Sequence, residues 1–519
     1  MPWPIGALVG KPSRSKEQCL FPAIESENSS ARSPVVASFG PARRPLHIRP
    51  DAPETRRAKL RAVRIRFFVV AFLVSTSLFA ADAAPSLREF MFAMPKGGDL
   101  HNHLYGAVYA ETFLDLARRD GMCFDATRAI VPCGDGATPI DKAFTDSSVY
   151  SSLLDSMSMR QFRPGNESGH DHFFSTFRKF GNVSRKHVPE MLTEIVEREA
   201  EENVKYLELT FAPDLGGAST AIAPLVSGDT LEEMYASVMN NPEKLAQLDD
   251  VVASARRTLD AAEASMRNTL RCGARFPRPG CSSTVRYIYE LYRGTPNRSV
   301  FAGMLVGYRL ANVDPRVVAV NPVMPEDGYL SMTQFDEQMQ MFAFFRARYP
   351  RVHLTTHAGE LWLGLVPIEG LRNHIRDSVF VAGAERIGHG VDIAFERDSS
   401  EVMKVMAERR VAVEICLTSN DVILGVRGRE HPLRLYMQHG VPVTLATDDP
   451  GVSRDDMTNQ YMRAVQEQGL TYEELKDIAH NGIKYSFVDA DTKTRLLKDL
   501  DERFKAFEDK YGDALPAAP

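Results

Sequence analysis

The sequence predicts an α/β fold, a closed (β/α)8 TIM barrel of parallel strands with long insertions after strands 1 and 2. Two observations predict it. Short apolar or β-branched segments alternate with helical patterns from about residue 97 onward, and histidine or carboxylate motifs follow several of these segments. Because such barrels build their sites at the carboxyl ends of their strands, the motif positions agree with the fold.

Eight segments are expected to be strands, with helical patterns between them. Periodicity alone leaves the second and third ambiguous between strand and helix. In chain order the segments are 97–103, 204–211, 284–291, 317–323, 353–357, 385–389, 411–416 and 441–447.

Two long interruptions separate the early strands, at about 121–185 and 214–283. The first contains Phe173–Phe180, an amphipathic helix that is either a lid over the site or ordinary core. The second contains 245–264, whose apolar residues recur every three or four positions and predict a long helix packed on the barrel. Two further helices, 456–469 and 472–500, are expected to close the barrel.

Three histidine segments and one acidic segment suggest a metal site. His101 and His103 lie two apart on a predicted strand, so both side chains point to the same face. A third imidazole, His357, and the carboxylate of Asp448 come from later strands. One His-x-His motif alone usually marks exposed or hydrogen-bonded histidines, but the four segments together predict a nitrogen and oxygen site, which suits zinc.

A second His-x-His motif, His170-Asp-His172, lies in a polar stretch directly before the Phe173–Phe180 helix. We expect no metal there. Asp171 is predicted to cap the amino end of that helix, because a carboxylate there accepts the free amide hydrogens.

The four segments, in this order, resemble the adenosine/AMP deaminase branch of the metal-dependent amidohydrolases over roughly residues 92–490. The resemblance also assigns 204–211 and 284–291 as strands. Segments 359–367 and 417–420 are similar to bacterial exported and growth-factor-like members. By position, the resemblance implies one Zn²⁺ per chain held by His101, His103, His357 and Asp448, a proton-donating Glu360, a water-orienting His389 and a substrate-contacting Asp449.

The implied reaction is hydrolytic deamination of adenosine or 2′-deoxyadenosine to inosine and ammonia. Zinc would lower the pKa of water toward about 7 and so supply hydroxide at neutral pH. Glu360 would protonate the ring nitrogen next to the attacked carbon, which requires a raised pKa in a dry pocket. Asp449 would hydrogen-bond the imidazole edge of the purine; alternatively, it orients a ligand histidine.

Two positions depart from the family pattern on the substrate side. The residue two past the second histidine, commonly a ribose-contacting aspartate, is Tyr105 here. Met324 stands near the position of a glycine whose backbone meets the purine. The reaction type is therefore better supported than the identity of the nucleoside.

Three other functions are considered. A deaminase of another purine or of a 5′-modified adenosine is compatible with Tyr105 and Met324. Deamination of AMP is disfavoured, since no Arg or Lys cluster beside the motifs would grip a phosphate. A secreted nucleoside-binding protein without catalysis is disfavoured by the intact Glu360 and His389.

Residues 1–84 are expected to be a leader that takes no part in the fold, and 85–519 a single deaminase domain. The basic segment 56–66, the apolar run Phe67–Ala80 and the small residues Ala81-Asp-Ala83 predict a cleaved secretory signal. Residues 1 to about 55 precede any normal signal, as expected from a start codon assigned too early. The mature protein is expected to be exported, to the periplasm or outside the cell.

Removing residues 1–84, which carry 13 Lys or Arg and 6 Asp or Glu, changes the formal net charge from −6 to −13. Because a surface this acidic repels phosphate groups, nucleic acids and anionic membranes are not expected as partners after signal cleavage. A small neutral purine nucleoside is compatible with this charge.

The cysteine spacing also suggests export. Cys123 and Cys133 lie in the first interruption, Cys272 and Cys281 lie in the second, and Cys416 stands alone in an apolar segment. Two local disulfides are the hypothesis. The alternative is that all five are free thiols; none is expected to bind the metal.

Overall fold

The computed structural model describes residues 85–165 and 167–512, so the predicted leader and signal lie outside the described residues. Eight parallel strands follow one another around a nearly closed barrel, in the order β1-β5-β6-β7-β8-β9-β10-β11. This confirms the predicted (β/α)8 barrel. The strands are β1 (Gly97–His103), β5 (Val204–Phe211), β6 (Thr284–Tyr292), β7 (Val317–Val323), β8 (His353–Ala358), β9 (Arg386–His389), β10 (Ala412–Ile415) and β11 (Val443–Leu445).

The barrel closes where β11 meets β1, at the predicted metal ligands. Asn102 and Asp448 form a parallel β-bridge. The backbone N–H of Asp448 donates to the carbonyl oxygen of His101 (2.8 Å), and the backbone N–H of His103 donates to the carbonyl oxygen of Asp448 (2.9 Å). Backbone hydrogen bonds across the closure therefore join two of the motif segments directly.

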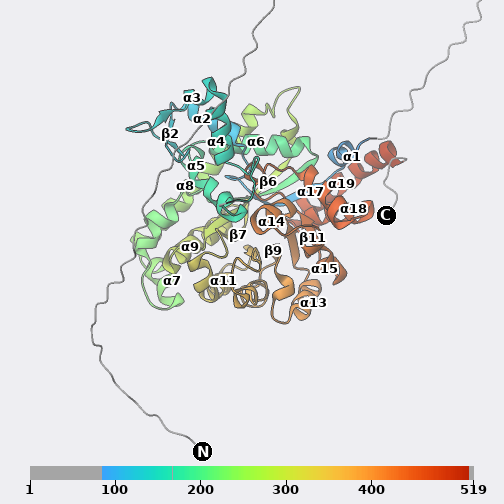
Figure 1. Cartoon of the computed structure of the whole chain (residues 1–519). Helices are drawn as coiled ribbons and strands as arrows, with labels where there is room; N and C mark the ends of the chain where they lie inside the picture. Colours follow the sequence, from blue (N-terminus) through green and yellow to red (C-terminus); the bar gives the residue numbers. More distant parts are fainter. Residues whose placement is uncertain (1–84, 166, 513–519) are drawn as a thin grey trace, which may run out of the picture. The chain divides into compact units, whose positions relative to one another are not determined.

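Helices follow the strands and surround the barrel (Figure 1). All seven residues of β1 are buried, as expected for a parallel strand covered on both faces. The helices between and after the strands are α6 (Val188–Glu201), α8 (Pro242–Thr269), α9 (Asn297–Val313), α11 (Phe335–Arg348), α12 (His374–Asp377), α13 (Ser399–Arg409), α15 (Leu433–Gln438) and α18 (Tyr472–Lys484).

Additional helices lie near the two ends of the described residues and in the loops at the carboxyl ends of the strands. They include α1 (Leu87–Ala93), α10 (Tyr329–Thr333), α14 (Leu417–Leu424), α16 (Pro450–Ser453), α17 (Met457–Gln468) and α19 (Ala490–Tyr511). No described helix is both long and apolar enough to cross a membrane.

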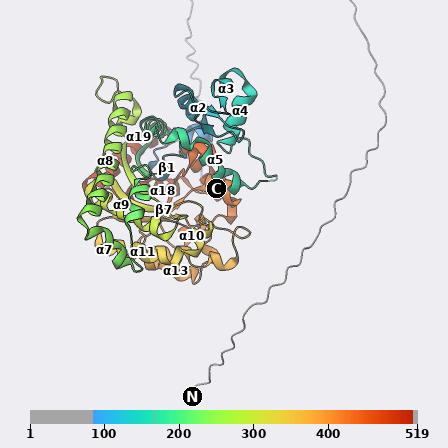
Figure 2. The same ribbon diagram turned by 90° about the vertical axis from the view of Figure 1, so that its left-hand side faces the viewer.

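Both predicted insertions are present. The first holds a three-stranded antiparallel sheet of β2 (Cys123–Phe124), β3 (Ile130–Val131) and β4 (Thr138–Pro139), with α2 (Ala110–Arg119), α3 (Asp141–Thr145), α4 (Ser147–Ser156) and α5 (Gly169–Ser184). The second holds α7 (Leu231–Met239) and α8, the predicted long helix, which packs against α6 and α9. In Figures 1 and 2, α3 and α4 lie at the end of the molecule opposite to α11 and α13.

Two local predictions were wrong. Helix α5 begins two residues before Asp171, and the hydroxyl of Ser168 caps it by accepting the N–H of Asp171 (3.0 Å). The stretch 472–500 is two helices, α18 and α19, separated by a turn. In each case a local polar residue, Ser168 or Asp489, caps a helix start that the apolar spacing did not locate.

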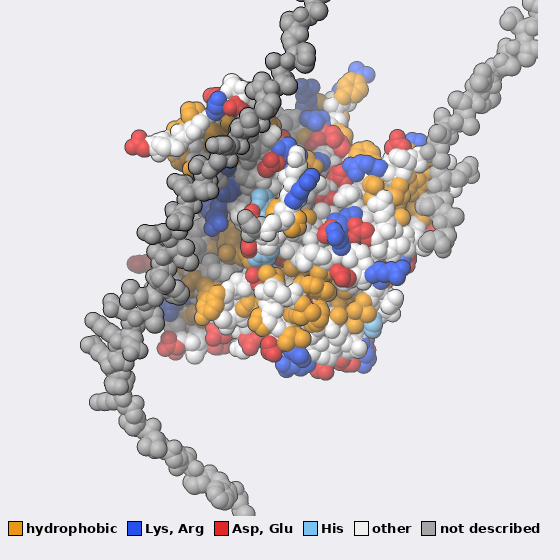
Figure 3. All heavy atoms as spheres, in the orientation of Figure 1, with side chains coloured by type: hydrophobic (Ala, Val, Ile, Leu, Met, Phe, Trp, Pro, Cys, Tyr) orange, Lys and Arg blue, Asp and Glu red, His pale blue; other side chains and the backbone are white. Residues whose placement is uncertain are grey.

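Both predicted disulfides are formed, Cys123–Cys133 and Cys272–Cys281, and Cys416 is a buried free thiol. Each bridge closes a short loop inside one of the two insertions. Figure 3 shows acidic and basic side chains interspersed with apolar ones over one face of the described residues, so this face carries no single sign of charge.

Candidate active site

Four buried side chains from three strand ends converge at one point. The Nε2 atom of His357 lies 3.1 Å from Nε2 of His101 and 3.2 Å from Nε2 of His103. The Oδ1 atom of Asp448 lies 3.4 Å and 3.3 Å from the same two atoms of His101 and His103. The four predicted ligands are therefore brought together and can hold a metal ion.

These separations fit a small divalent cation. Ligand atoms placed tetrahedrally at the usual zinc distances lie about 3.3 Å apart. Three imidazole nitrogens and one carboxylate oxygen form a donor set that divalent zinc favours. The four side chains meet both requirements.

Neighbouring groups fix the protonation of two of the imidazoles. The Nδ1 atom of His101 lies 2.6 Å from Glu414 Oε2, and Nδ1 of His357 lies 3.0 Å from Asn321 Oδ1. Because both partners are acceptors, each ring has its Nδ1 proton engaged and can present the Nε2 lone pair to a bound metal ion. The hydroxyl of Ser419 donates to Oδ2 of Asp448 (2.6 Å), which leaves Oδ1 facing the histidines.

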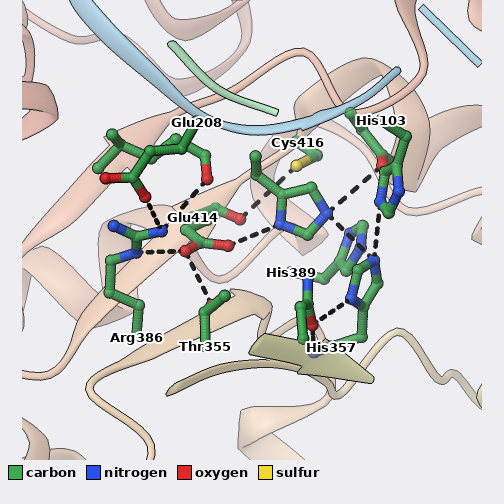
Figure 4. Close-up of polar contacts among 12 residues, drawn as sticks. His103, Glu208, Thr355, His357, Arg386, His389, Glu414 and Cys416 are labelled. Atoms are coloured by element: carbon green, nitrogen blue, oxygen red, sulfur yellow. Dashed lines mark hydrogen bonds and ion pairs between the residues drawn. The ribbon is translucent and has the colours of Figure 1, made fainter. Parts of the chain in front are cut away.

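A buried ion network holds Glu414 (Figure 4). Its Oε1 atom accepts from Arg386 Nε (2.5 Å) and Thr355 Oγ1 (2.9 Å), and Arg386 also pairs with Glu208 (2.6 Å). Burial raises the pKa of Glu414, but Arg386 and His101 outweigh burial and hold the pKa at about 2. Glu414 is therefore a carboxylate at neutral pH and a constant acceptor for His101.

Glu360 and His389 lie beside the four ligands. Oε1 of Glu360 is 3.7 Å from Nε2 of His389. Burial, with the nearby charges of Asp448 and Glu326, raises the pKa of Glu360 well above its ordinary value. Burial lowers the pKa of His389 to about 3, so its imidazole is neutral. The pair thus combines a carboxyl whose pKa is raised with a neutral imidazole.

Left-handed backbone turns aim two of these side chains. His389 has φ 66° and Asp448 has φ 62°, values that are uncommon outside glycine. Both residues stand where a strand ends, at β9 and just after β11. Such strain costs on the order of 1–3 kcal/mol per residue and persists where the surrounding structure enforces it, which is common at functional sites.

Glu326, from the loop after β7, holds the backbone of Glu360. Its carboxylate accepts the N–H groups of Gly359 (3.1 Å) and Glu360 (2.7 Å), and it receives Nδ1–H of His374 (2.6 Å). Burial raises the pKa of Glu326, but Arg293 and His374 outweigh it and keep the residue ionised. The turn that presents Glu360 is therefore clamped by a fixed charge.

The three predicted substrate-contacting residues all lie at carboxyl ends of strands. Asp449 is buried beside Gly106, where a Cβ would overlap its carboxyl group, and its Oδ1 atom has no hydrogen-bond partner within the described part of the chain. The rings of Tyr105 and Phe211 pack edge to face, with centroids 5.7 Å apart. Met324 directly follows β7 and is 39% exposed, with its side chain against Gly294.

Cys416 differs from its predicted setting. It lies just past β10 rather than within the strand, and it offers a ligand atom near those of His389 and Asp448. Burial and the charge of Asp448 raise the pKa of this thiol well above its ordinary value, so it stays protonated and is a poor ligand.

The second His-x-His motif is engaged elsewhere. Nε2 of His170 pairs with Asp327 (3.0 Å), and His172 contacts Glu167 (3.0 Å) and backbone carbonyl oxygens. This agrees with the expected hydrogen-bonded role. Helix α5 packs against α14 and α16, which follow β10 and β11, and its role as a lid stays a prediction.

Sequence reasoning missed the residues that support the ligands. The sequence does mark two of these residues as unusual. Glu414 is the lone charged residue of the apolar segment Val411–Ile415, and Asn321 is a polar residue in the apolar segment 317–323. A polar residue inside a buried strand needs a partner, so each one marks a contact. Neither position reveals from sequence alone which histidine it meets.

A family model described as adenosine deaminase matches residues 154–503, two thirds of the chain. The chain belongs to the adenosine deaminase family. The matched range begins after β1, so it does not include His101 and His103; the structure places that strand beside the others.

Curated relatives match in part or at low identity. An aminodeoxyfutalosine deaminase from Streptomyces coelicolor is 35% identical over 165 residues, which cover 30% of this chain and 38% of the relative. An adenosine deaminase from Escherichia coli is 36% identical over 154 residues, 30% of this chain and 43% of the relative. An adenosine deaminase from Clostridium kluyveri is 22% identical over 417 residues, 80% of this chain and 95% of the relative. The first two matches thus span less than half of each relative.

Two solved structures share the fold. An amidohydrolase from Burkholderia ambifaria with bound Zn has a TM-score of 0.52 at 20% identity, covering 84% of this chain and 97% of that one. An N6-mAMP deaminase from Arabidopsis has a TM-score of 0.51 at 22% identity, covering 80% and 99%. At these identities the likeness concerns the barrel and its helices.

Proposed function

We propose that this protein is a zinc-dependent hydrolase that deaminates adenosine, and 2′-deoxyadenosine, to inosine and ammonia. The observation that carries the proposal is the convergence of His101, His103, His357 and Asp448 beside Glu360, a carboxyl whose pKa is raised by burial. Family membership supports the reaction class, and the bound Zn of the Burkholderia ambifaria amidohydrolase supports the metal.

When bound, a zinc ion would lower the pKa of water and make hydroxide available near neutral pH. The chain's own residues then handle the protons. Glu360 gives its proton to the ring nitrogen beside the attacked carbon as negative charge develops there. The resulting carboxylate takes the proton of the added hydroxyl and passes it to the departing amine, which leaves as ammonia.

Two residues favour a second candidate, deamination of another purine or of a 5′-modified adenosine. Tyr105 replaces a carboxylate at the position expected to face the ribose, and burial and Glu290 raise the pKa of its phenol, so it stays neutral. Met324 places a partly exposed, flexible thioether at the carboxyl end of β7, where a wider or more apolar substrate could contact it.

The first test is a spectrophotometric assay of the zinc-loaded protein. The adenine absorbance of adenosine should fall as inosine forms. Substrate preference is ranked by comparing the rates for deoxyadenosine, adenine, AMP, N6-methylated adenosine and 5′-modified adenosines. Replacing the proton donor, Glu360→Gln, should lower kcat by roughly 10²- to 10⁴-fold. The exposed Glu401→Gln on α13 is the matched control and should leave kcat unchanged.

An unchanged rate in Glu360→Gln would remove Glu360 from the mechanism. A wild-type protein with stoichiometric zinc that deaminates none of the panel would overturn the proposed function and favour a nucleoside-binding protein without catalysis.

We also propose that the mature protein is exported, to the periplasm or outside the cell. The two disulfides support this location, because such bonds persist in oxidising compartments and are rare in the cytosol.

A further inference from the structure

A line of three buried side chains connects the catalytic pair to a helix start behind it. Asn420, on α14, lies with Nδ2 3.0 Å from Nδ1 of His389 and with Oδ1 3.0 Å from Nε2 of His431. The N–H of Leu433, the first residue of α15, lies 3.2 Å from Nδ1 of His431. All three side chains are at most 2% exposed.

The direction of each hydrogen bond follows from its far end. A backbone N–H can only donate, so Nδ1 of His431 is an acceptor. Burial, helped by Arg463, lowers the pKa of His431 to about 3, so the ring is neutral and its one proton is on Nε2. That proton is donated to Oδ1 of Asn420, which leaves the amide N–H of Asn420 to donate to Nδ1 of His389.

The opposite orientation of the Asn420 amide is excluded by the same backbone group. It would turn the amide N–H toward Nε2 of His431 and force the proton of that ring onto Nδ1. The N–H of Leu433 and an N–H on Nδ1 of His431 would then face each other, and the buried hydrogen bond between these two groups would be lost.

We propose that His431 and Asn420 are positioning residues that fix the tautomer of His389 with its proton on Nε2, so that His389 donates a hydrogen bond to the attacking water and does not act as its base. This inference rests on the proposed deaminase function. Nε2 of His389 is buried and has no hydrogen-bond partner among the described residues, which leaves this donor free for the substrate water.

The surroundings of His389 agree with a donor at Nε2. Its ring faces His101 and His357, with centroids 4.9 Å and 5.1 Å away, and lies near the carboxylate of Asp448 and the carboxyl group of Glu360. An N–H on Nε2 of His389 can donate to the oxygen of a water molecule that lies between this ring and the side chains of Asp448 and Glu360. That water is then held with a lone pair available for attack.

The decisive measurement is the tautomer of His389. Zinc-loaded protein with ¹⁵N-labelled histidine would be examined by long-range ¹H–¹⁵N NMR, and His389→Gln would assign the signal. A proton on Nε2 in the wild-type protein is the expected result. A proton on Nδ1, with Nε2 bare, would overturn the proposal even if deaminase activity were normal.

The cause is tested with Asn420→Asp, which keeps the shape but replaces the donor with an acceptor. At a pH where NMR shows a neutral ring, the proton should move to Nδ1, and kcat should fall by about 10²- to 10⁴-fold with KM nearly unchanged, as for a catalytic histidine in the wrong tautomer. His431→Leu should give a smaller fall in the same direction.

Asn481→Asp is the matched control, since its Nδ2 donates to Val443 at the amino end of β11, away from His389. It should leave the tautomer and kcat unchanged. If Asn420→Asp moved the proton without lowering kcat, or lowered kcat without moving it, the proposal would be wrong. Inactive wild-type protein with the proton on Nε2 would instead count against the deaminase function.

Discussion

At the scale of single residues, the site depends on buried polar groups that each have a fixed partner. Glu414 accepts from His101 and is itself held by Arg386, so one carboxylate links a ligand to the barrel interior. An ion pair this buried is costly to break, because removing one partner leaves an unpaired charge. The barrel interior therefore fixes the orientation of His101 through Glu414.

Glu414→Gln tests this link. The amide is a weaker acceptor for His101, so the affinity for zinc should fall by about 10- to 100-fold. Competition with a chromogenic chelator measures the change. Glu385→Gln is the matched control, because Glu385 pairs with Nδ1 of His353, an exposed histidine outside the site. Equal zinc affinities for the two variants would contradict the role given to Glu414.

At the scale of elements, α18 supports the strand that carries two ligands. Gly98 of β1 and Gly482 of α18 lie against each other, and a Cβ on Gly482 would come within 2.6 Å of the carbonyl oxygen of Gly98. A capping box of Thr471 and Glu474 starts α18, so the helix is well anchored at its amino end. Helix and strand can approach this closely only because neither residue has a side chain.

Gly482→Ala should separate α18 from β1 and destabilise the fold by roughly 1–3 kcal/mol, as overpacking does. Thermal or urea unfolding measures the loss, and zinc affinity should fall with it because His101 and His103 move with β1. Gly181→Ala within α5 is the control, since a Cβ there meets nothing within 4 Å. A Gly482→Ala protein as stable as the control would refute this packing argument.

At the scale of the whole molecule, each of the two insertions is cross-linked by a disulfide bond. Each disulfide closes a loop of about ten residues outside the barrel, while the barrel itself depends on its core. In the chain-entropy account such a bridge stabilises by about 2–3 kcal/mol, mainly by restricting the unfolded chain.

Exported protein should therefore contain two disulfides and lack residues 1–84. Cell fractionation followed by intact mass measurement, with and without reductant, checks both points. Reductant should also lower Tm, and a variant with Ser at all four bridge positions should not respond to it. Protein found in the cytoplasm with the leader attached and all thiols reduced would contradict the export proposal.

Much of the fold was accessible from sequence because its signals are local. The strand segments are short and apolar, and the predicted bounds of β1, β5 and β7 match the structure. The segment 204–211 needed the family resemblance, since a buried apolar run does not distinguish strand from helix. The start of α5 was missed because the capping choice between Ser168 and Asp171 depends on backbone geometry.

By itself, the sequence determined which residues form the candidate site, because residue type and strand-end position limit where metal ligands and proton donors can stand. Only the tertiary structure decided their partners. Glu414 with His101, Glu326 with Glu360 and Asn420 with His389 lie on different strands and loops. Such pairs form only when the barrel closes, and they set the protonation on which the site depends.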